Sequence, residues 1–208
     1  PRKNRIKGEK FKVGNVVKSV IRKVMIDKSQ GIYVELSRTS PKFLESLLEL
    51  EVPEIKDGLI KIVGSARIPG ERAKISLMSL HPNIDAVGAT VGTRGVRINA
   101  VSKELSDENI DCIEYSNIPE IFIARALSPA IISNVKIQNG KAIVTLPSDQ
   151  KSKAIGKSGI NIRLTSMLSG FEIELVESGG AAVNADDSTK DDQPSRDPNA
   201  LKNLFGGL

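Results

Sequence analysis

The sequence predicts an α+β fold built mainly from two small, related units. Two Gly-x-x-Gly turns begin at Gly92 and Gly156, which lie 64 residues apart (156 − 92). Each turn joins two stretches of helical character and follows two stretches of strand character. Aromatic residues make up only 3% of the chain and Trp is absent, so the cores must be aliphatic and the domains small.

The first 40 residues are predicted to contain a β-hairpin. Residues 13–26 and 31–36 are rich in β-branched side chains, and Asp27 to Gln30 supply turn chemistry between them. Two strands bury too little apolar surface to be stable alone. We therefore expect residues 1–40 either to be part of a larger β-barrel or to pack against the unit that follows.

Residues 41–117 are predicted to form the first unit. Ser40 and Pro41 are typical of a helix start, and the helix should end before Pro53. Strands are expected over 59–68 and 72–80, a short helix from Asp85 to the first glycine turn, a longer helix to about 105, and a strand over 109–115.

Residues 118–177 repeat this order and are predicted to form the second unit. A helix over 119–127 precedes strands over 131–138 and 141–147, which Asn139 and Gly140 join as a tight hairpin. Asp149 is expected to cap a short helix that leads to the second glycine turn. A longer helix and a strand over 171–176 complete the unit.

Residues 178–208 have the composition of a disordered acidic tail, with few apolar side chains. Within it, residues 199–205 could form two helical turns with one apolar face. This predicts a docking peptide for a protein partner, with an ordinary tail as the alternative.

The net charge of +5 is unevenly distributed along the chain. Residues 1–40 carry 11 Lys and Arg against 3 acidic residues, a local charge of +8. A basic cluster is the electrostatic feature expected of a protein that binds a phosphate backbone, although a solvated surface has the same composition.

The two glycine turns are the candidate RNA-binding site. Glycine at both ends lets the backbone approach a ligand closely, and the N-terminus of the following helix favours an anion. This order of strands, helices and turn is that of a KH unit, in which the turn clamps about four nucleotides of single-stranded RNA. The residues expected to contact RNA are Gly92, Thr93, Arg94, Gly95, Arg97, Gly156, Lys157, Ser158, Gly159 and Arg163.

Other ligands and enzymatic chemistry have little support in the sequence. Gly156 and Lys157 resemble the end of a nucleotide-binding P-loop, but Lys151 stands where that motif needs glycine. A helix-turn-helix that binds duplex DNA is a stronger competitor, yet the strand pairs favour the KH order. His81 reads as a turn residue and Cys112 as a buried strand residue, so we expect no enzyme, no cofactor and no metal.

The chain is expected to be cytoplasmic. It has no apolar run long enough to span a membrane and no leader peptide, and its single cysteine indicates a reducing compartment. A start at Pro1 rather than Met suggests a fragment.

Six segments resemble the NusA family of bacterial transcription elongation and termination factors. They are residues 36–41, 51–55, 85–89, 91–95, 126–130 and 154–159. The resemblance implies two tandem prokaryotic-type (type II) KH domains, preceded over residues 1–40 by the C-terminal part of an RNA-binding OB-fold barrel. It also implies single-stranded RNA as a ligand, and RNA polymerase as a partner that binds mainly through a region absent here, in termination or antitermination.

Two other classes of function stay open from the sequence. One is an accessory module of an RNA-processing enzyme, although no large catalytic core is present. The other is a scaffold whose KH units pack against polymerase or the ribosome instead of RNA, which salt-dependent RNA binding would distinguish.

Overall fold

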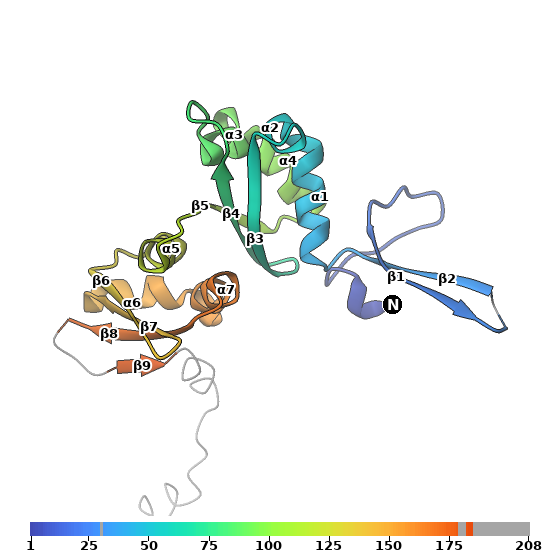
Figure 1. The fold of residues 1–208 in the computed structure, drawn as a ribbon. Helices are drawn as coiled ribbons and strands as arrows, with labels where there is room; N and C mark the ends of the chain where they lie inside the picture. Colours follow the sequence, from blue (N-terminus) through green and yellow to red (C-terminus); the bar gives the residue numbers. More distant parts are fainter. Residues whose placement is uncertain (30, 179–181, 185–208) are drawn as a thin grey trace, which may run out of the picture.

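The protein, seen as a computed structural model, is an α+β chain with three separate sheets (Figure 1). The structure describes residues 1–29, 31–178 and 182–184. A two-stranded sheet, a three-stranded sheet and a four-stranded sheet follow one another along the chain. The two larger sheets each carry helices and correspond to the two predicted units.

The N-terminal region contains a 3₁₀ turn (Arg2–Asn4) and the antiparallel strands β1 (Val20–Asp27) and β2 (Gly31–Ser37). The hairpin projects away from the rest of the chain (Figure 1). Large apolar side chains such as Val24, Ile26 and Ile32 are exposed on it. The described residues contain this two-stranded hairpin and no barrel, so the larger barrel expected from the sequence is not seen in them.

The start of the chain is nevertheless fixed to the first unit. Ile6 is 2% exposed and lies in the core of that unit. The guanidinium of Arg38 donates to the carboxylate of Glu9 at 2.7 Å and to that of Glu104 at 2.9 Å. It also stacks on the ring of Phe43, 4.9 Å from the centroid. These contacts hold the base of the hairpin against the first unit.

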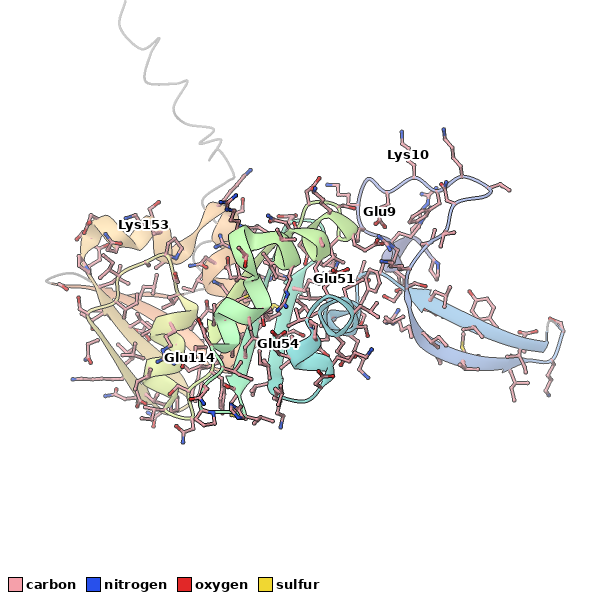
Figure 2. All side chains as sticks on the ribbon, turned by 90° about the horizontal axis from the view of Figure 1, so that it is seen from above. Glu9, Lys10, Glu51, Glu54, Glu114 and Lys153 are labelled. Atoms are coloured by element: carbon pink, nitrogen blue, oxygen red, sulfur yellow. The ribbon has the colours of Figure 1, made fainter. Side chains whose placement is uncertain are left out.

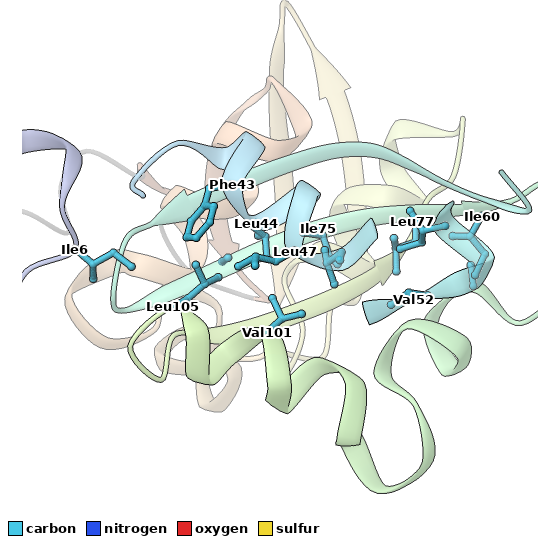
Figure 3. Packing of buried hydrophobic residues seen from close by; sticks show 14 residues of the cluster. Ile6, Phe43, Leu44, Leu47, Val52, Ile60, Ile75, Leu77, Val101 and Leu105 are labelled. Carbon is cyan, nitrogen blue, oxygen red and sulfur yellow. The ribbon is translucent and has the colours of Figure 1, made fainter. Parts of the chain in front are cut away.

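The first unit consists of a mixed sheet with helices on one face. Its elements are α1 (Pro41–Glu51), α2 (Pro53–Lys56), β3 (Ile60–Ile68), β4 (Arg72–Ser79), α3 (Ala86–Val91), α4 (Val96–Glu104) and β5 (Asn109–Glu114). The strand order is β3-β4-β5, with β3 antiparallel and β5 parallel to β4. Ser40 caps α1 through a bond from the Lys42 N–H, as the sequence predicts. The core packs side chains of α1, α4 and β4 together (Figure 3).

A buried ion pair closes one end of this unit. Arg67 on β3 and Glu108, just before β5, both have fully buried side chains, with Nε to Oε1 at 2.7 Å. Glu108 also accepts from the Gly70 N–H, and Arg67 donates to the Arg38 carbonyl. The turn before β5 is folded inward because Arg67 needs a buried acceptor.

The second unit has the same core order. Its elements are α5 (Pro119–Ala126), β6 (Asn134–Gln138), β7 (Lys141–Leu146), α6 (Ser148–Ile155), α7 (Ile160–Ser169), β8 (Glu172–Glu177) and β9 (Ala182–Asn184). β6 pairs antiparallel and β8 parallel with β7, matching β3 and β5 around β4.

Two details of the second unit differ from the prediction. Asp149 does not cap α6, because the helix begins at Ser148 with Pro147 in the N-cap position, and Asp149 lies in its first turn. Strand β9 lies in the segment predicted as tail, where it pairs antiparallel with the outer edge of β8. Backbone pairing at a sheet edge is only weakly visible in sequence. The predicted docking peptide, residues 199–205, and the rest of the predicted tail beyond residue 184 lie outside the described residues.

The two units pack directly on each other. Helix α7 lies against β3 and β4, on the face of the first sheet opposite α1 and α4. A small apolar cluster crosses the boundary, formed by Ile113 and Tyr115 of the first unit with Phe122, Ala126 and Leu168 of the second. The Tyr115 and Phe122 rings meet edge to face at 5.4 Å. Tyr115 is therefore part of this boundary.

The burial of the Arg67–Glu108 pair predicts that replacing Glu108 destabilises the protein much more than replacing an exposed, ion-paired glutamate. Glu108→Ala leaves the Arg67 guanidinium buried without its carboxylate, so we expect the free energy of unfolding to fall by about 3–5 kcal/mol. Urea denaturation followed by circular dichroism measures this. The control is Glu172→Ala, which breaks an exposed pair with Lys141 and should cost less than about 1 kcal/mol. Equal losses in both variants would contradict the structural role of the Arg67–Glu108 pair.

Candidate nucleic-acid interface

The two glycine turns adopt the same backbone conformation. In the first turn the φ angles of Gly92, Arg94 and Gly95 are 75°, 55° and 75°. In the second turn the φ angles of the matching residues Gly156, Ser158 and Gly159 are 75°, 51° and 70°. Each turn is closed by a bond from the last glycine N–H to the first glycine carbonyl, at 3.0 Å and 3.2 Å. The repeat predicted from spacing therefore extends to individual dihedral angles.

The first glycine of each turn is required by close packing as well as by its φ angle. A Cβ at Gly92 would lie 2.8 Å from Cγ of Arg97, and a Cβ at Gly156 would lie 2.7 Å from Cβ of Asn161. In both turns the obstructing residue belongs to the first turn of the next helix. The chain thus folds back over each glycine and leaves no room for a side chain.

The middle residues of both turns face solvent. Thr93, Arg94, Lys157 and Ser158 are all exposed, next to the N-termini of α4 and α7. Exposed N–H groups and a positive helix end favour an anion at this point. The cation stands third in the first turn and second in the second turn, so the two turns present their positive charges at different positions.

Arg97, one of the predicted contacts, is held by the protein itself. Its Nη1 donates to the Ala89 carbonyl at 2.7 Å and to Oε2 of Glu54 at 2.9 Å. Asn161, 64 residues later (161 − 97), donates to the Lys153 carbonyl at 3.2 Å. Ala89 and Lys153 are also 64 residues apart (153 − 89). Arg97 and Asn161 therefore perform the same task of tying the helix before each turn to the helix after it.

The ion pair with Arg97 affects the pKa of its acidic partner, Glu54. The pKa of the Glu54 carboxyl is lowered, first by a hydrogen bond from its own backbone N–H and then by Arg97. Glu54 lies on α2 and is labelled in Figure 2. Its charge compensates Arg97 and makes this arginine less attractive to a phosphate than Arg94.

Arg163 is the other predicted contact that lies outside the turns. It is exposed on α7 and takes part in none of the ion pairs found in the part of the chain that the structure describes. Lys153, which the sequence analysis did not single out, is also exposed and lies on α6 just before the second turn (Figure 2).

The basic N-terminal cluster is partly neutralised by nearby acidic side chains. Arg22 pairs with Glu35 at 2.9 Å, and Lys18 lies 3.9 Å from the carboxylate of Glu104. The pKa of Glu35 is lowered, first by a hydrogen bond from Asn4 and then by Arg22. Lys10 remains exposed at the end of the molecule that carries the hairpin (Figure 2).

The residues considered for other chemistry have ordinary surroundings. His81 is exposed in the turn after β4, where its Nδ1 accepts from the Asn83 N–H. Burial raises the pKa of the Cys112 thiol to about 12, so the thiol stays protonated at neutral pH. No group of three or more potential metal ligands occurs among residues 1–29, 31–178 and 182–184. Within the same ranges, no helix has the length and apolar character needed to cross a bilayer.

Comparison with protein families identifies both units. Residues 38–115 match the NusA-like first KH domain, and residues 119–183 match the NusA-like second KH domain. The second match includes most of β9, the strand that the sequence analysis did not predict.

Curated relatives agree with these matches. The transcription termination/antitermination protein NusA of Helicobacter pylori is 48% identical over 98% of this chain and 57% of its own length. The proteins of the same name from Thermus thermophilus and Bacillus subtilis are 43% and 38% identical, over 85% and 84% of this chain. The alignments cover 46% and 47% of those two proteins. The chain thus spans about half the length of the curated relatives it matches.

The packing around the second turn predicts that alanine destabilises the protein more at Gly156 than at Gly140. Gly156 combines φ 75° and ψ 175° with a blocked Cβ site, so Gly156→Ala should cost about 2–4 kcal/mol of unfolding free energy. The matched control is Gly140→Ala, which has φ 80° but open space around its Cβ and should cost about 1–2 kcal/mol. Thermal unfolding of both variants compares them. A smaller loss for Gly156→Ala than for Gly140→Ala would show that the second turn is not packed as described.

Proposed function

The chain belongs to the NusA family, and from that premise we propose that its two KH units bind single-stranded RNA with their glycine turns. The observation that carries this proposal is the shared backbone conformation of the two turns. Both place exposed polar residues at the N-terminus of the following helix, with one cation in each turn. A phosphate-binding geometry made twice in one chain favours a ligand with repeated phosphates.

The residues assigned to RNA contact fall into two groups. The first group forms two clamps, one in each glycine turn. The first clamp consists of Gly92, Thr93, Arg94 and Gly95, and the second of their counterparts Gly156, Lys157, Ser158 and Gly159. Arg163 adds an exposed cation on α7, whereas Arg97 acts by positioning the first clamp.

We assign four regions to the chain: 1–40, 41–117, 118–177 and 178–208. The first is proposed to be the end of an OB-fold, because the β1–β2 hairpin exposes apolar side chains that a complete barrel would bury. The next two are the KH domains, for which the parallel pairing of β4 with β5 and of β7 with β8 supports the prokaryotic, type II topology. The last is proposed to be an acidic tail that includes β9.

In the cell, we propose that RNA binding serves transcription termination and antitermination alongside RNA polymerase. The support is the name shared by the relatives, which denotes a transcription factor and not an enzyme. This role places the protein in the cytoplasm, with the polymerase contact made mainly by sequence outside this chain.

Charge reversal in the clamps tests the RNA proposal. The double variants Thr93→Asp/Arg94→Asp and Lys157→Asp/Ser158→Asp should each weaken binding of single-stranded RNA about tenfold or more, because a carboxylate repels the phosphates. Asp tolerates the positive φ found at Arg94 and Ser158, so the fold should survive. Fluorescence anisotropy over a range of salt concentrations should also show a salt slope lower by about one in each variant.

The matched control is Lys136→Asp/Gln138→Asp, which changes the charge by the same amount at two exposed positions of β6. We expect this control to weaken binding less than about threefold. If the clamp variants bind RNA as tightly as the control, RNA is not held by the glycine turns. A wild-type protein without salt-sensitive RNA binding would instead support a protein scaffold.

A further inference from the structure

An apolar groove with an acidic rim lies beside β3, at one end of the first sheet. Its volume is about 320 Å³, near the lower limit of the range of about 300–1,000 Å³ found for ligand sites. Glu45 and Glu49 of α1 form the rim. The apolar part of the lining consists of Ile55, Ile60, Ile62 and Leu80. Ile60 belongs to the core of the first unit (Figure 3), whereas Leu80 is 57% exposed.

The exposed apolar surface continues beyond the groove. The Leu80 N–H bonds to the Leu59 carbonyl at 2.9 Å, so these two residues lie side by side where β3 begins and β4 has ended. The Leu59 side chain is exposed as well. Apolar surface that extends from a groove is typical of a docking site, and it favours an occupant with several apolar side chains.

The charges around the groove favour an occupant that is positively charged. Glu49 is exposed and takes part in none of the ion pairs among the described residues. Glu45 accepts a hydrogen bond from the Ser65 hydroxyl and has no cationic partner among the same residues. The cation of the lining is Lys61, so two carboxylates against one ammonium leave a net charge of −1.

The last ten residues of the sequence, 199–208, have the matching chemistry. They place apolar side chains at positions i, i+3, i+4 and i+7, the pattern of a helix that binds a groove with one face. These side chains are Leu201, Leu204, Phe205 and Leu208. Lys202 is the charged residue of the segment, and on a helix it lies beside Phe205, at the border of the apolar face.

The chain between β9 and this segment is long enough to reach the groove. Residues 185–198 separate Asn184, the last residue of β9, from Asn199, and these 14 residues (198 − 184) can span about 45–50 Å when extended. A unit the size of residues 41–117 is only about 30 Å across. The second unit also contacts β3 directly through α7. The segment can therefore reach the groove while β9 stays paired with β8.

A tethered segment has an advantage over any free partner. A flexible linker of this length gives an effective concentration of about 1 mM, so docking with a dissociation constant of about 1 mM already fills half of the grooves. The β1–β2 hairpin also exposes apolar side chains, but β1 carries Arg22 and Lys23 within a region of net charge +8. Those cations repel Lys202, whereas the groove attracts it.

We propose that residues 199–208 dock as an amphipathic helix in this groove of the same chain. Leu201, Leu204 and Phe205 face its apolar lining, and Lys202 lies against Glu49. The docking goes beyond RNA binding, because it gives the end of the chain a partner within the first unit. It also leaves the two glycine turns uncovered, since β3 and the groove lie at the end of the sheet opposite β5.

A photocrosslinker tests this docking in the whole chain. Benzoyl-phenylalanine in place of Phe205 should crosslink to peptides of α2 and β3 that line the groove. Leu201→Asp/Leu204→Asp should lower the yield of these crosslinks about tenfold or more, because two leucines leave the apolar contact. The matched control is Asn199→Asp/Asn203→Asp, which adds the same charge on the opposite face of the helix and should keep the yield within about twofold of wild type.

An exchange of charges tests the position of Lys202. Glu49→Lys and Lys202→Glu should each lower the crosslink yield about threefold, because each brings two like charges together. The double variant Glu49→Lys/Lys202→Glu restores an attractive pair, so its yield should return to within about twofold of wild type. Equal losses in the double variant and in the single variants would overturn the assigned contact.

Mixing isotope-labelled with unlabelled chains identifies the docking partner. Crosslinks within one chain are the expected result. Crosslinks only between labelled and unlabelled chains would make a second copy the partner, and crosslinks to the β1–β2 hairpin would make the hairpin the docking surface. Either result overturns the proposal, as would equal yields in Leu201→Asp/Leu204→Asp and its control.

Discussion

The position of the two clamps relative to each other depends on one constraint. The second unit packs on the face of the first sheet that the first unit's own helices leave uncovered. Helix α7 begins at the second clamp and lies against β3 and β4, where Leu168 would be 3.6 Å from a Cβ at Gly64. The buried ammonium of Lys74 bridges Asp111 in the first unit and the Ser128 carbonyl in the second. Burial lowers the pKa of Lys74, and Asp111 opposes this shift. Apolar contact and one bridging charge thus fix the units together.

Inside each unit, a single side chain fixes the path of the glycine turn. A side chain at the start of the second helix covers the first glycine and binds a carbonyl of the preceding helix, as Arg97 and Asn161 do. This fixes the path of the turn, while its two middle residues stay exposed to solvent. A rigid turn that presents N–H groups and a cation loses little entropy when it binds a phosphate. The residue in this position differs between the two turns: it is the ion-paired Arg97 in the first turn and the buried Asn161 in the second.

Much of the fold could be predicted from the sequence because it depends on local chemistry. Ser40 and Pro41 begin a helix, Asn139 and Gly140 make a turn, and glycines spaced 64 residues apart mark two equivalent loops. The contacts that could not be predicted join distant residues. The Arg67–Glu108 pair spans 41 residues, and no neighbour of Glu108 in the sequence indicates that its carboxylate is buried. The partner of Arg97 on α2 and the pairing of β9 with β8 likewise depend on the folded arrangement, which no local pattern encodes.

The central claim is that the two glycine turns are held at a fixed separation before any RNA binds. Spin labels at Arg94→Cys and Lys157→Cys measure that separation by double electron-electron resonance, in a chain in which the native Cys112 is replaced by Ser so that only the two introduced cysteines are labelled. The account predicts one narrow distance distribution in the free protein that persists when RNA of about twelve nucleotides binds. A broad distribution in the free protein that narrows only with RNA would contradict it, because the units would then be mobile and ordered by the ligand.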